Sequence, residues 1–179
     1  MENRFAALTE WHDFFAAVAG VAATLVGLLF VALALNPAVM ADDSPAGLRT
    51  WAGHTFHSFL LVLVIALIVL IPETGPLGLG LPLLILGVWG VTRIIIEARQ
   101  VRSDPAPEWH GRSVLTRFAL PFAGYAIGAW VGLQALRGDA DVVGWLVATV
   151  FLLMMSAAGN CWDLLREIGD RHRSEVADP

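Results

Sequence analysis

Residues 11–36 read WHDFFAAVAGVAATLVGLLFVALALN, and their only strongly ionisable side chains, His12 and Asp13, lie at the start. A signal peptide has a basic N-terminal region followed by an apolar core of about 7–15 residues. Here the preceding region is acidic, and the apolar run is longer than twenty residues. Because about 20 apolar residues cross the hydrocarbon core of a bilayer, we expect a retained membrane span over 14–35. Small residues after the run leave cleavage as the alternative.

The composition of the whole chain also indicates a membrane protein. Of its 179 residues, 57% are hydrophobic and only 15% are charged, whereas a soluble domain has about 25% charged residues. The single cysteine, Cys161, excludes an intramolecular disulfide. The net charge is −5, and no basic patch is interleaved with aromatic residues, so we expect no nucleic-acid partner.

Four more stretches are long and apolar enough to cross a bilayer. They are 51–71, 77–96, 118–136 and 142–165. Residues that favour turns separate most of them, and a long polar loop over 99–117 separates the third from the fourth. We therefore predict an all-α integral membrane bundle of five transmembrane helices, forming one domain over 1–179 with a polar tail over 166–179.

The arginines predict the orientation, because loops on the cytoplasmic side of a membrane carry an excess of basic residues. All eleven basic residues are arginine, and five spans place only Arg4 and Arg137 on the side of the N-terminus. The other nine lie on the side of the long loop and the tail. We therefore expect the N-terminus outside and the C-terminus in the cytoplasm.

Small residues follow one another at intervals of three or four along the first span, so they share one helical face. They are Ala16, Gly20, Thr24 and Gly27. Helices associate in lipid by close backbone approach at small residues, and we expect this face to pack against another helix of the chain. A contact between subunits and the lining of a pore are the alternatives. The opposite side, with Phe15 and Leu29, is expected to face lipid.

The fourth span carries a second set of small residues, spaced by four. The pattern G-x-x-x-G-x-x-x-G runs through Gly124, Gly128 and Gly132. Such a stripe is a close-contact surface between helices. It predicts contact, within the chain or between subunits, and no chemistry.

Polar residues within the spans gather toward the expected cytoplasmic half. The second span contributes His54, His57 and Ser58, and the fifth contributes Asn160 and Asp163. Polar groups in a membrane are energetically costly and often mark solute or proton pathways. We therefore expect these five side chains to line a water-accessible vestibule. The alternatives are histidines that only hydrogen-bond a neighbouring helix, and an Asp163 that simply lies at the interface.

The third span adds Arg93 and Glu97, four residues apart, which predicts an ion pair at the edge of the vestibule. Arg93 also lies close enough to the interface to extend its charge into water. A metal bound by His54 and His57 is a further alternative. We expect no metal and no other cofactor, because there is no second histidine pair and no H-E-x-x-H pattern. Catalytic motifs are absent too, so we expect no enzyme.

The run quoted above resembles the opening of small, mostly uncharacterised multi-pass inner-membrane proteins of high-GC bacteria. The resemblance covers about 26 residues and implies a bacterial inner-membrane protein whose first helix is tightly packed. It assigns no functional residue.

These patterns predict a small membrane channel or transporter-like protein with a polar vestibule on its cytoplasmic side. Five helices enclose only a narrow interior, so a homo-oligomer is expected. The alternative is a non-conducting accessory or scaffold subunit, whose charged tail would bind a partner protein.

Overall fold

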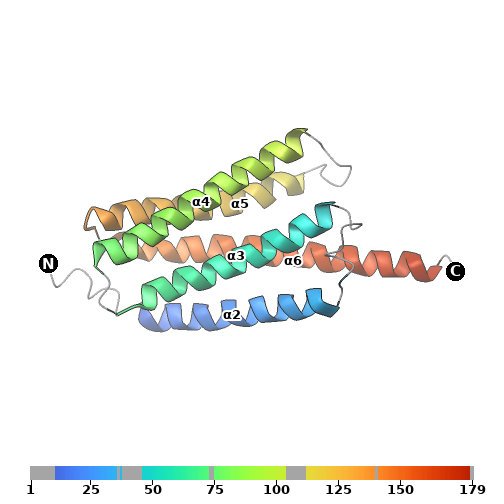
Figure 1. Ribbon diagram of the computed structural model, residues 1–179, viewed down its shortest axis with the longest axis horizontal. Coiled ribbons are helices and arrows are strands. Elements are labelled where there is room, and N and C mark those ends of the chain that lie inside the picture. The colour runs from blue at the N-terminus through green and yellow to red at the C-terminus, as the bar shows by residue number, and fades with distance from the viewer. Residues whose placement is uncertain are drawn as a thin grey trace.

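The computed structural model describes residues 11–35, 37, 46–72, 75–103, 112–139 and 141–177. These residues form a helical bundle that contains no strand. Its helices, in chain order, are α2 (His12–Leu35), α3 (Ala46–Leu70), α4 (Pro76–Ser103), α5 (Arg112–Leu136), the short 3-10 helix η3 (Asp141–Gly144) and α6 (Trp145–Ala177). Figure 1 shows the long helices lying roughly along one axis.

The predicted all-α fold with five membrane-spanning helices is confirmed. Within the described chain, five helices are long and apolar enough to cross a bilayer. Their apolar parts are His12–Leu35, Ala52–Leu70, Pro76–Arg99, Phe118–Leu136 and Asp141–Asp163. Each lies within a few residues of its predicted span, because the hydropathy of the sequence directly reports the apolar length that a bilayer requires.

The polar stretch expected as a loop over 99–117 is partly helical. Helix α4 continues to Ser103, and α5 already begins at Arg112. The alternating charges of the tail over 166–179 predict a helix that extends beyond the apolar segment, and α6 does continue past its apolar part to Ala177. A helix ends where its backbone hydrogen bonding ends, and arginine and glutamate are good helix formers. The predictions from hydropathy found the ends of the apolar segments and not the ends of the helices.

The helices pack in two pairs that α6 joins. Helix α4 packs mainly on α5, and α2 packs on α3, while α6 contacts both α3 and α5. In Figure 1, α2 lies at one edge of the bundle and α4 at the other. Helices α3 and α4 touch little, so the boundary between them, the α3–α4 seam, separates the two pairs.

Helices α4 and α5 approach each other closely because glycines line both. A Cβ at Gly80 would lie 2.7 Å from the carbonyl oxygen of Gly132, and one at Gly87 would lie 2.5 Å from the backbone nitrogen of Ala129. Such contacts are possible only where a side chain is missing. The α4 glycines Gly80, Gly87 and Gly90 were not identified from the sequence as a contact surface. Their spacings are seven and three residues, and the expected pattern has a spacing of four.

The predicted glycine stripe of the fourth span contacts two helices. Gly132 lies against α4, whereas Gly124 and Gly128 face Leu153 and Thr149 of α6. A helix that lies between two neighbours can present one row of small residues to both, since the row drifts slowly around the helix axis.

The small face of α2 differs from the first expectation, because it does not pack against another helix in the part of the chain that the structure describes. Its four residues are exposed, and nothing lies within 4 Å of a Cβ placed on Gly20 or Gly27. The side expected to face lipid is the buried one, with Phe15 at 0% and Leu29 at 5% exposure. The larger side chains fill the space between helices. The sequence did not show this orientation because α2 is apolar on every side. A subunit contact through the small face stays a prediction.

Candidate functional site

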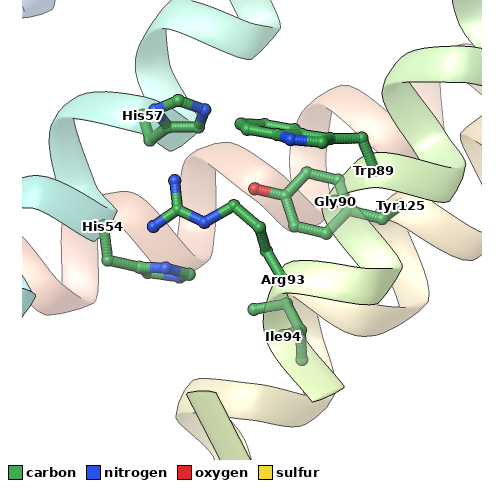
Figure 2. A pocket seen from close by; sticks show the side chains of 7 residues that line it. All are labelled: His54, His57, Trp89, Gly90, Arg93, Ile94 and Tyr125. Atoms are coloured by element: carbon green, nitrogen blue, oxygen red, sulfur yellow. The ribbon is translucent and has the colours of Figure 1, made fainter. Parts of the chain in front are cut away.

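A polar cluster crosses the α3–α4 seam. It comprises His54 and His57 of α3, Trp89, Arg93 and Glu97 of α4, and Tyr125 of α5. Figure 2 shows the two histidines extending from α3 toward Arg93 and Trp89, with the Tyr125 ring behind them. Three helices thus contribute to a site that the sequence places on separate segments of the chain.

Glu97 forms the centre of the charged part of the cluster. Its Oε1 accepts a hydrogen bond from Nη2 of Arg93 at 2.9 Å, and its Oε2 lies 3.3 Å from Nδ1 of His54. The side chains of Glu97 and His54 are only 15% and 13% exposed, whereas that of Arg93 is 40% exposed. One carboxylate therefore joins a cation on its own helix to an imidazole on another helix.

The predicted pair of Arg93 and Glu97 therefore forms. Its i,i+4 spacing on one helix made it visible in the sequence. The contact of Glu97 with His54 was not expected, because it depends on how α3 and α4 are rotated toward each other.

Trp89 connects His57 to the charged part of the cluster. Its ring centroid lies 4.6 Å from that of His57, at an angle of 42° between the planes. The guanidinium carbon of Arg93, one turn further along α4, lies 5.4 Å from the Trp89 ring, within the range of a cation–π interaction. The indole thus positions His57 and Arg93 together. Trp89 lies four residues before Arg93, a spacing that brings two side chains together on one helix. This spacing could have identified Trp89 as a member of the site from the sequence.

Tyr125 brings α5 into the site. Its ring lies directly on Gly90 of α4, where a Cβ would lie 2.5 Å from the ring carbons. The Tyr125 hydroxyl is hydrogen-bonded to Ser58 of α3, and the hydroxyl of Ser58 in turn donates to the carbonyl of His54 at 3.0 Å. Tyr125 is the sole tyrosine of the chain, which would have been a reason to consider it.

The side chains of the cluster surround a cavity of about 10 Å³. A cavity of this size is about large enough to hold one water molecule. The cavity is lined by His54, His57, Trp89, Gly90, Arg93, Ile94 and Tyr125. His57 is five residues inside the start of its apolar segment at Ala52, which corresponds to about 8 Å of depth at 1.5 Å per residue.

The cavity brings together only some of the residues that were expected to line the vestibule. The lining of the cavity includes the two histidines, but neither Asn160 nor Asp163 of α6 is part of it. Asn160 is buried at 8% exposure, and Asp163 is half-buried. Ser58 is fully buried behind the histidines. The prediction grouped these residues by depth alone, whereas the histidines face α4 and α5.

Metal binding was the further alternative for His54 and His57. In the part of the chain that the structure describes, no three histidine, cysteine, aspartate or glutamate side chains come together as a metal-binding group. His54 is occupied by Glu97, and His57 stacks on Trp89. Both histidines therefore already have partners, and a metal ion would have to displace these contacts to bind them.

No protein-family model, curated protein or solved structure matches this chain. The function therefore has to be argued from the cluster and its position in the bundle.

Proposed function

We propose that the protein is a small membrane channel or transporter-like protein whose polar path enters at the α3–α4 seam. The observation that supports this most is the network of Arg93, Glu97 and His54 within the apolar segments of two helices. Ionisable side chains at such positions are costly, and they commonly mark ion or proton pathways.

The arrangement of the helices supports the same proposal. Helices α3 and α4 belong to different pairs, their backbones come close at few places, and polar side chains connect them. A passage that opens here would separate polar groups that water can solvate, while the closely packed α4–α5 contact stays intact. The cavity of 10 Å³ corresponds to a closed state with room for about one water.

Assembly from several copies is part of the proposal. The exposed small face of α2, formed by Ala16, Gly20, Thr24 and Gly27, would pack against a second copy. From the excess of arginine on one side, we place the cluster in the cytoplasmic half of a bacterial inner membrane.

The test is transport by the purified protein in liposomes, measured as proton or ion flux under imposed gradients. Glu97→Gln removes the charge that joins the two helices, and we expect it to change the flux at least several-fold. Asp139→Asn removes a carboxylate from the turn before η3 and keeps the oxygen that accepts a hydrogen bond from the backbone N–H of Asp141, so it should leave the flux unchanged. Equal flux in the wild type and in Glu97→Gln would refute a path through the cluster.

A non-conducting accessory subunit is the second candidate, and the small volume of the cavity favours it. In that case the cluster would only fasten α3 to α4. Folded wild-type protein would then show no flux above that of empty liposomes under any gradient, and a partner protein would copurify in stoichiometric amount.

A further inference from the structure

Two hydroxyl groups on α6 are buried without a hydrogen-bond partner. Among the described residues, the buried side-chain polar atoms in this state are Oγ1 of Thr149 and Oγ of Ser156. Thr149 is 0% exposed and Ser156 is 4% exposed. A buried hydroxyl that loses its bonds to water is destabilising, so a buried polar group in this state points to a missing ligand.

Other hydroxyls in these helices behave differently. Thr24, Ser58 and Thr92 each donate to the backbone carbonyl four residues earlier, at 2.8–3.0 Å. That local bond is the usual solution for serine and threonine in a membrane helix. Thr149 and Ser156 do not form it, so their oxygens are available to the interface between α5 and α6.

Both side chains lie on the side of α6 that packs against α5. Thr149 and Leu153 contact the α5 glycines Gly128 and Gly124, and Ser156 is seven residues from Thr149 and three from Leu153, on the same face. Beside Thr149 the glycine leaves room, since a Cβ at Gly128 would be 3.5 Å from Cγ2 and 3.8 Å from Oγ1. A space about the size of a methyl group therefore adjoins this hydroxyl.

The second hydroxyl lies opposite a proline. The two helices are antiparallel, and the pairing of Gly124 with Leu153 brings Pro121 level with Ser156 one turn further along. Pro121 lies inside α5 and is fully buried. It has no N–H, so the carbonyl of Arg117 lacks its donor within the helix. Ordered waters and serine side chains commonly satisfy carbonyls that a proline frees within a membrane.

We propose that the α5–α6 interface binds ordered water at two places, one beside Thr149 and Gly128 and one between Ser156 and the Pro121 turn. We assign the ligand as water because the polar groups at the two places are hydroxyls and a backbone carbonyl, to which water can donate and from which it can accept. These waters extend the polar interior beyond the His54–Glu97 cluster, since Tyr125 lies one turn from Pro121 and lines the cavity of the cluster. The proposal does not depend on transport activity.

The test is solid-state NMR of the labelled protein in lipid bilayers, which measures how fast magnetisation passes from water to each side chain. We expect transfer to the Cβ of Thr149 and Ser156 to be several-fold faster than to Thr24, whose hydroxyl already donates to a carbonyl of its own helix. In Gly128→Ala, where the new Cβ meets Thr149 without a clash, transfer to Thr149 should slow while Ser156 is unchanged. Rates as slow as that of Thr24 at both sites would overturn the proposal.

The substitution Thr149→Val gives an independent result, because valine has nearly the same shape but no hydroxyl. If water is bound, the melting temperature should stay the same or fall, since the bonded hydroxyl is lost. A clear rise in melting temperature would mean that the hydroxyl is dry, and it would contradict the proposal.

Discussion

Nδ1 of His54 lies 3.3 Å from Oε2 of Glu97, and this contact joins α3 to α4 where the two helices otherwise touch little. The same carboxylate binds Arg93 on its own helix. The geometry makes Glu97 the residue on which the other two members of the charged network depend.

Glu97→Gln should therefore lower the stability of the bundle. The substitution leaves an arginine and a histidine in a membrane segment without their carboxylate, and we expect a loss of about 2 kcal/mol, less than for a fully buried pair because Arg93 is partly exposed. Unfolding in mixed micelles of increasing denaturing-detergent content measures it. Asp139→Asn is the matched control and should change little. Equal losses in both variants would show that the network does not hold the seam.

Gly87→Ala should destabilise the α4–α5 pair. The new Cβ would lie 2.5 Å from the backbone nitrogen of Ala129, so the two helices must move apart, at a cost of about 1–3 kcal/mol. The control is Gly53→Ala on α3, where nothing lies within 4 Å of the new Cβ. That change should be neutral or slightly stabilising, because alanine favours helix. Thermal unfolding of both variants in the same detergent measures the difference.

Gly20→Leu should disrupt self-association without disturbing the fold of one chain. Gly20 lies on the exposed small face of α2, with open space around it, so a large side chain there can obstruct only a contact with another molecule. Light scattering of protein in nanodiscs or mild detergent reports the number of subunits. Gly159→Leu is the control, since Gly159 is exposed on α6 with similar space. A wild-type protein that is monomeric at every concentration would contradict the prediction.

The ends of the bundle should lie on opposite sides of the membrane. Five spans would place the start of α2 and the end of α6 at opposite faces, and the excess of arginine on one side predicts that the end of α6 lies in the cytoplasm. Reporter fusions after residue 179 should be active only for a cytoplasmic reporter, and a single cysteine before α2 should react with impermeant reagents from outside. Both ends in one compartment would refute the five-span topology.

The spans and the Arg93–Glu97 pair could be predicted because both are local properties of the chain. Span length follows from hydropathy, and an ion pair at i,i+4 follows from the pitch of one helix. The outer face of α2 and the contact of His54 with Glu97 depend on how helices rotate about their own axes. A helix that is apolar on every side, such as α2, carries no pattern that determines this rotation.

The grouping of His54 and His57 with Asn160 and Asp163 illustrates the same limit. Depth in the membrane could be counted along each helix, but depth alone does not determine which neighbour a side chain meets. In the structure the neighbours of the two histidines come from α4 and α5. Gly90 has no side chain, so the Tyr125 ring can lie against α4 and form one wall of the cavity that the histidines line.

The central position of α6 has a consequence for biogenesis. It follows the other long described helices in the chain, yet it contacts both α3 and α5. Until α6 is synthesised, the two pairs, α2 with α3 and α4 with α5, lack the helix that contacts both of them. We therefore expect a chain truncated before Trp145 to be degraded faster in the cell than the full chain.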